Sequence, residues 1–212
     1  MTKSRSYNLL LLGLTAVFIG YLSVWLPGPG AGLSFLGFEL GEWIKFAGVG
    51  PERNLFYLPP ISLALILVAL TLPWDNGRVQ TWLMRGLGVV ISLLAFPAWE
   101  DIIGPARPDY MVRVQWIGLV VVAAVIVSIF GWTVKRPVRE WVCWASLAGL
   151  GLVGAIQPIR VYLQIQPNIS QLLGIKVGFG WGIVLNGVGH LMITGISLWY
   201  LFQLWGQKKH SA

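Results

Sequence analysis

The chain has 212 residues, of which 56% are hydrophobic and 11% are charged, and its formal net charge is +7. A soluble domain carries about 25% charged residues, so this composition excludes an ordinary soluble fold and predicts an all-α polytopic membrane protein. The single cysteine, Cys143, excludes a disulfide framework within the chain. The basic residues are scattered between apolar segments, which argues against a nucleic-acid partner and makes the lipid bilayer the expected one.

Apolar stretches long enough to form membrane-spanning helices follow one another along the chain. The first stretch has about 18 apolar residues, which favours an uncleaved span over a cleaved signal peptide, although the latter stays open. All the stretches belong to one transmembrane domain, residues 1–212. The six predicted spans cover residues 8–26, 55–72, 82–98, 115–134, 141–157 and 177–205.

The connection between the first two spans has helical periodicity over residues 33–47. Leu40 and Ile44 fall on one face, and Glu39 and Glu42 fall on the other. This pattern predicts an amphipathic helix lying in the membrane interface. A helix packed on the neighbouring spans is the alternative, because it would be equally amphipathic.

Residues 159–166, between Pro158 and Pro167, alternate strictly between apolar and polar side chains. A period of two is typical of extended chain with one face on an apolar surface. The sequence therefore predicts a short extended segment in an outer loop.

The last span carries small and polar residues at every fourth position. Residues four apart lie on one helix face, and small residues let a second helix backbone approach closely. We expect this face to pack against the small residues of the fifth span. The stripe consists of Gly174, Gly178, Gly182, Asn186, His190 and Thr194.

His190 is the only histidine in any of the apolar stretches. An intramembrane histidine can relay protons, bind a metal or tetrapyrrole, or contact a substrate. The alternative is a neutral side chain that is hydrogen-bonded across a helix interface.

The distribution of charge predicts the orientation. With six spans, the side that carries both termini has nine of the 15 Lys and Arg residues and two of the eight Asp and Glu residues. Positively charged loops stay in the cytoplasm. We therefore expect both termini to be cytoplasmic, in a bacterial cytoplasmic membrane.

The outer loops carry the candidate polar site, with Glu39 and Glu42 nearby if residues 33–47 fold over it. Carboxylates bind cations or act as acid and base, and arginine holds anionic head groups. Interface anchoring and ordinary loop ion pairs are the alternative. The candidate residues are Glu100, Asp101, Arg107 and Arg160.

No nucleotide-binding, nucleophile-elbow, zinc-protease or CxxC motif occurs in the sequence, so no metal site is predicted and no cofactor is required. We expect a non-catalytic subunit or assembly partner of a membrane complex, with other membrane proteins as possible partners. A small transporter or permease-like component is the first alternative. An intramembrane enzyme that acts on lipid at the outer leaflet is the second.

Overall fold

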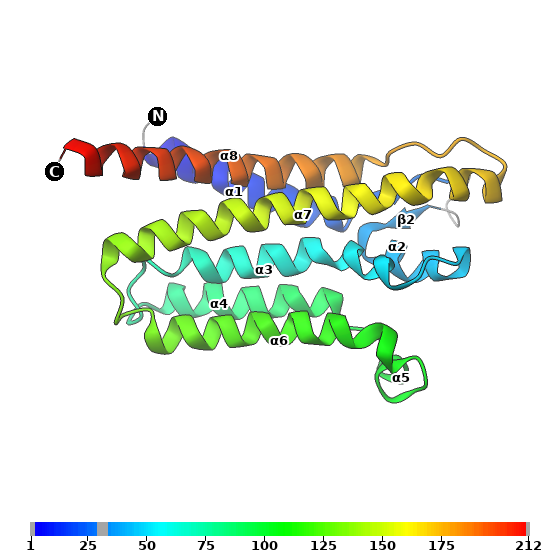
Figure 1. Ribbon diagram of the computed structural model, residues 1–212, viewed down its shortest axis with the longest axis horizontal. Coiled ribbons are helices and arrows are strands. Elements are labelled where there is room, and N and C mark those ends of the chain that lie inside the picture. Colours follow the sequence, from blue (N-terminus) through cyan, green and yellow to red (C-terminus); the bar gives the residue numbers. More distant parts are fainter. Residues whose placement is uncertain (1–2, 29–33, 211–212) are drawn as a thin grey trace.

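The computed structural model describes residues 3–28 and 34–210. Its long helices run side by side, and α1 begins at the same end of the bundle at which α8 ends (Figure 1). We call this the termini end and the opposite end the cap end. The helices are α1 (Lys3–Tyr21), α2 (Gly37–Trp43), α3 (Leu58–Leu70), α4 (Val79–Ser92), α5 (Trp99–Ile103), α6 (Arg107–Phe130), α7 (Arg136–Leu173) and α8 (Trp181–His210).

Short 3-10 helices and one small antiparallel ladder complete the fold. The 3-10 helices are η2 (Ile44–Ala47), η3 (Pro51–Tyr57) and η4 (Leu93–Ala95), and the paired strands are β1 (Val24–Leu26) and β2 (Phe35–Leu36).

Four helical stretches of the described chain are long and apolar enough to cross a membrane. The remaining apolar helices, α1 and α4 with η4, are shorter. The fold is therefore all-α and compatible with a helical membrane protein, while the count of six spans stays a prediction. The four candidate spans are Pro51–Leu70, Arg107–Phe130, Arg136–Leu173 and Trp181–Gly206.

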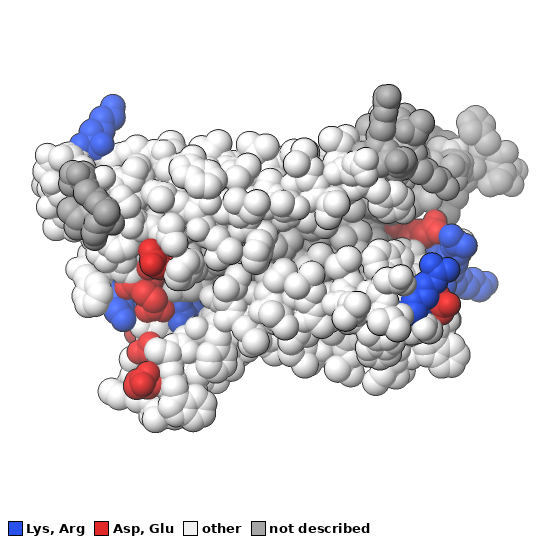
Figure 2. Space-filling view, turned by 180° about the vertical axis from the view of Figure 1, so that it is seen from behind, with Lys and Arg blue, Asp and Glu red and all other residues white. Residues whose placement is uncertain are grey.

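Charged side chains gather at the two ends of the molecule. Figure 2 shows a broad band without Lys, Arg, Asp or Glu between these ends on the face that it presents. Such a band is what the hydrocarbon core of a bilayer requires of a protein surface.

The predicted extended segment at residues 158–167 is wrong, because these residues lie inside α7. The buried side chains Val161, Ile165 and Ile169 are spaced four apart, whereas Leu163, which shares the alternating pattern, is exposed. The apolar positions thus also fit a helical period. The helix ends at Gly174, whose φ of 64° is the left-handed conformation that glycine adopts without strain.

The helix predicted over residues 33–47 is shorter and is packed on protein. Residue 33 lies outside the described residues, residues 35–36 form β2, and the helical part is α2 followed by η2. Leu40 and Ile44 are fully buried. They belong to an apolar cluster at the cap end that includes Trp25, Leu26, Phe56, Val161 and Ile165.

Other boundaries also differ from the predicted spans. The first helix stops at Tyr21, because residues 24–26 pair as β1. The fourth starts at Arg107 rather than at residue 115, since a proline in the first turn of a helix costs no hydrogen bond. The fifth continues to Leu173, so its 38 residues measure about 57 Å, more than the roughly 30 Å of a bilayer core.

Two pairs of glycines bring the backbones of α1 and α8 together. A Cβ atom on Gly20 would lie 2.8 Å from the Gly182 carbonyl oxygen, and one on Gly189 would lie 2.7 Å from the Gly13 carbonyl oxygen. Helices can approach so closely only where side chains are missing. The α1–α8 contact therefore depends on these four positions.

Gly20→Ala should destabilise the protein by about 2 kcal/mol, because the added methyl group overpacks the contact with α8. Gly195→Ala is the matched control on α8, since no atom lies within 4 Å of its added Cβ. It should be neutral or stabilise by up to about 1 kcal/mol through helix propensity. Unfolding in detergent, followed by circular dichroism, measures both, and equal effects would contradict the packing argument.

Candidate functional site

The stripe predicted on the last span is only partly on one helix. Gly174 is the C-cap of α7, Gly178 precedes α8, and α8 starts at Trp181. Gly182 lies in α8 but contacts α1 instead of the fifth span. The expected contact with α7 is made further along α8, where Gly151 and Gly154 of α7 face the polar part of the stripe.

The three polar residues of the stripe are buried and hydrogen-bonded to three different helices. Asn186 Nδ2 donates to the Val17 carbonyl oxygen of α1 at 2.9 Å. Thr194 Oγ1 donates to the Ala148 carbonyl oxygen of α7 at 3.4 Å. His190 contacts α3, as described next. The polar part of the stripe thus joins α8 to α1, α3 and α7.

His190 forms a buried pair with Ser62. Its Nδ1 lies 3.0 Å from the Asn186 carbonyl oxygen, and its Nε2 lies 2.8 Å from Ser62 Oγ. A carbonyl oxygen only accepts, so Nδ1 carries the proton and Nε2 of the neutral ring is an acceptor. The single proton of the Ser62 hydroxyl has two acceptors within reach, Nε2 and the Pro59 carbonyl oxygen at 3.0 Å. His190 and Ser62 are at most 1% exposed. A side chain on Gly154 would collide with both of them.

This Ser–His geometry resembles an activated nucleophile, but it is closed to substrate. A nucleophile needs space beside its oxygen for a reacting carbon and donors for the charge that develops. Here Gly154 packs directly against Ser62 Oγ and His190 Nε2. The geometry therefore supports the packed, neutral histidine.

The four residues of the predicted outer site lie on three helices. Glu100 and Asp101 lie on α5, Arg107 starts α6, and Arg160 is exposed on α7. No ion pair of the described chain joins any two of them. The described residues also contain no group of three His, Cys, Asp or Glu side chains that could hold a metal ion.

A different polar cluster, centred on Glu42 of α2, lies at the cap end. Arg113 Nη1 donates to Glu42 Oε1 at 2.6 Å, and the Tyr57 hydroxyl approaches the same oxygen at 3.2 Å. The Tyr110 hydroxyl and Lys45 Nζ lie 3.1 and 3.4 Å from Oε2. One carboxylate thus joins α2, η3 and α6.

The guanidinium group of Arg113 contacts two aromatic rings in addition to the Glu42 carboxylate. Its guanidinium carbon lies 4.1 Å from the centre of the Tyr57 ring and 4.9 Å from that of Tyr110, and the residue is 1% exposed. Arginine stacks on aromatic faces in this way, and burial strengthens the attraction. Gly41 leaves the space for the Tyr57 ring, because an added Cβ would overlap with it.

The sequence contained a partial signal for this cluster. Tyr110 and Arg113 are three apart and share a helix face, but the prediction assigned both to a loop before the fourth span. Glu42 was assigned to the solvent face of a helix. The sequence around Glu42 therefore gives no sign of Arg113, and the sequence around Arg113 gives no sign of Glu42.

Opposing effects set the ionisation of Glu42. Burial would raise the pKa of its carboxyl, but the charge and hydrogen bond of Arg113, the Tyr110 hydroxyl and Lys45 outweigh burial and lower the pKa. Burial would likewise lower the pKa of Lys45, and its contacts with Tyr110 and Glu42 raise it. The cluster therefore holds a carboxylate and two cations at neutral pH. This arrangement favours a structural role, in which the charged groups hold α2, η3 and α6 together, over acid–base chemistry.

Comparisons with known proteins add no family to this description: no protein-family model, no characterised protein and no solved structure matches the chain. Function is therefore inferred from the geometry.

Glu42→Gln should destabilise the protein by about 2 kcal/mol at neutral pH, because the buried Arg113 loses its counter-charge while Glu42 itself is partly exposed. Glu100→Gln, an exposed carboxyl outside every ion pair of the described chain, is the control. Unfolding temperatures in detergent measure both.

The same variant should remove part of the acid sensitivity. Because folding lowers the pKa of Glu42, its contribution is complete above the ordinary carboxyl pKa of 4.5 and is lost as the pH falls through the lowered pKa. The difference in unfolding temperature between the wild type and Glu42→Gln should shrink over this range. A difference in unfolding temperature that stays constant down to pH 3 would contradict the structural role of the Glu42–Arg113 pair.

Proposed function

We propose that this protein is a non-catalytic integral membrane protein, a subunit or assembly partner of a complex in a bacterial cytoplasmic membrane. The observation that carries the proposal is the use of every polar residue of the α8 stripe in helix packing. Asn186, His190 and Thr194 bind α1, α3 and α7 at distances of 2.8–3.4 Å.

Six crossings are part of this proposal. At about 1.5 Å per residue, the 19 residues of α1 measure about 28 Å. Residues 79–95 of α4 and η4 measure about 25 Å by the same rise. Both lie alongside the longer helices (Figure 1) and approach the roughly 30 Å of a bilayer core. The basic excess at the termini end supports a cytoplasmic location for that end.

The geometry gives less support to the alternatives. A permease needs polar groups along a path, but His190 and Ser62 are sealed. A lipid-processing enzyme needs a convergent acid, base and nucleophile. Glu100 and Asp101 are separated from the closed Ser62–His190 pair by their place on α5.

Replacing His190 tests the packing role directly. His190→Ala should lower the free energy of unfolding by about 3 kcal/mol, because it leaves a cavity and removes the contacts of the ring with Ser62 and the Asn186 carbonyl oxygen. Ser62→Ala should cost less, and the double variant should cost less than the two single effects added together, since both remove one interaction. Loss of a bound metal, of an absorption band or of transport without loss of stability would contradict the proposal.

Gentle purification from the native membrane tests the assembly role. A tagged chain, extracted with its surrounding lipid and weighed by native mass spectrometry, should carry another membrane protein at a fixed ratio. Tagging that protein in turn should return this chain at the same ratio. A chain that is recovered alone, and that turns over a lipid or moves a solute in vesicles, would overturn the proposal.

A further inference from the structure

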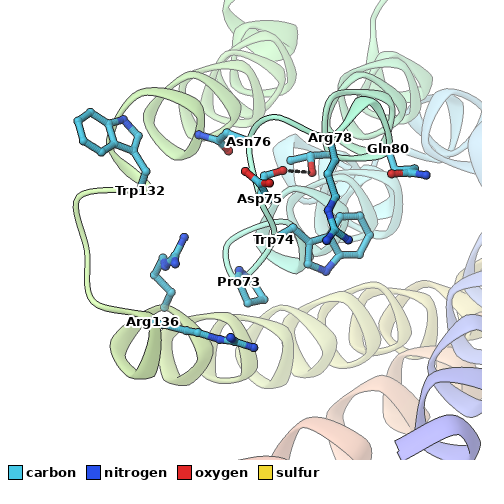
Figure 3. A pocket seen from close by; sticks show the side chains of 10 residues that line it. Pro73, Trp74, Asp75, Asn76, Arg78, Gln80, Trp132 and Arg136 are labelled. Atoms are coloured by element: carbon cyan, nitrogen blue, oxygen red, sulfur yellow. Dashed lines mark hydrogen bonds between the residues drawn. The ribbon is translucent and has the colours of Figure 1, made fainter.

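The termini end contains a cavity whose lining takes no part in the packing of the α8 stripe. Its volume is about 760 Å³, and Arg78, Arg136 and Arg139 line it together with Trp74 and Trp132. Figure 3 shows that the lining comes from the turn between α3 and α4, from the segment after α6 and from the start of α7. Arg78 and Arg136 lie on different sides of the space.

The positive charge in this cavity is incompletely compensated. Arg78 is exposed and Arg139 is half-buried, and neither takes part in an ion pair of the described chain. Arg139 Nη1 donates to the Leu72 carbonyl oxygen at 3.4 Å. Arg139 Nε is buried and has no hydrogen-bond partner among the described residues. Arg136 pairs with Glu140 at 3.0 Å, an exposed contact of the kind that contributes little and exchanges readily.

The acid in the lining, Asp75, offsets only part of the charge of the three arginines. Asp75 lies on the turn, where its carboxylate accepts the Gly77 N–H at 3.0 Å. Two helices also begin here, α4 after Arg78 and α7 after Lys135, and neither has a side-chain cap on its first N–H groups. Uncapped helix starts add partial positive charge to that of the arginines.

The cavity lies where lipid head groups would be. It adjoins a smaller cavity of about 310 Å³, which shares Pro73, Trp74 and Arg136 and is otherwise lined by residues of α1, α7 and α8 that include Trp144 and Tyr200. Tryptophan and tyrosine occupy the level of the head groups in membrane proteins. Figure 2 shows the charged end giving way to the uncharged band on the face that it presents.

From these observations we infer that the cavity binds the phosphate of an anionic phospholipid head group, held by Arg78, Arg136 and Arg139. Guanidinium groups bind phosphate oxygens in pairs of hydrogen bonds, and several from different segments can surround one phosphate. The inference rests on the membrane placement in the proposed function. The inference adds to the proposed function a class of ligand, the anionic phospholipids, and the site that binds it.

The test is lipid binding by the purified chain in neutral detergent, measured by native mass spectrometry with phosphatidylglycerol or phosphatidylcholine added. The wild type should retain phosphatidylglycerol preferentially. Arg78→Gln should weaken this retention about fivefold, and Arg78→Gln with Arg139→Gln about 25-fold. Added salt should weaken the wild type in the same direction, because part of the site is exposed.

The matched control is Arg107→Gln with Arg160→Gln, which removes the same charge from exposed positions at the cap end. It should retain phosphatidylglycerol like the wild type. Unfolding temperatures show whether Arg139→Gln disturbs the fold. If it does, the test rests on Arg78→Gln alone, because the Arg78 side chain is exposed.

Three results would overturn the inference: equal retention of the two lipids by the wild type, equal loss in the control, and displacement of the lipid by millimolar inorganic phosphate. The last would assign the site to a soluble phosphate instead. The failure of the proposed function and the failure of this inference give different results. A chain that does not span a membrane would not enter lipid nanodiscs. A chain that spans the membrane but lacks the head-group site would enter them and show no preference between the two lipids.

Discussion

The interior of this bundle depends on one constraint: a polar side chain within apolar surroundings must find its partner in the protein. Asn186, His190 and Thr194 meet it by contacts with α1, α3 and α7. These contacts are possible because glycines bring the backbones close enough for short side chains to reach across, as Gly154 does beside His190. Small and polar residues therefore act together, since the first provide the approach and the second make one particular approach more stable than its alternatives.

The two ends of the molecule use charge differently. At the cap end, Glu42 neutralises Arg113 between two aromatic rings, and the apolar cluster beside it lets α7 continue beyond the length that a bilayer needs. At the termini end, Arg78 and Arg139 lack such a counter-charge. An arginine paired with a carboxylate fixes structure, whereas arginines without a counter-charge beside tryptophan leave a place for an external anion.

Local patterns in the sequence predicted some of this fold and missed the rest for identifiable reasons. The all-α class and the apolar helices followed from composition and segment length. The alternation at residues 158–167 suggested a strand, because Val161 and Ile165 fit both a period of two and a helical period, and only the environment of Leu163 separates them. The Glu42–Arg113 pair joins residues 71 positions apart, so no local pattern could indicate it. The stripe was predicted by its spacing, but its division between a loop and α8 depends on where α7 ends at Gly174.

The partners of the α8 stripe have a further consequence for biogenesis. Val17, Ser62 and Ala148 all precede α8 in the chain, so they are made and delivered to the membrane before the residues that bind them. Until α8 is present, the Ser62 hydroxyl has only the Pro59 carbonyl oxygen as its acceptor, and the glycine surface of α1 is not covered. Assembly of the bundle is therefore completed after translation of α8, and an insertase or chaperone that shields α1 and α3 in the meantime would act on the surfaces that α8 later occupies.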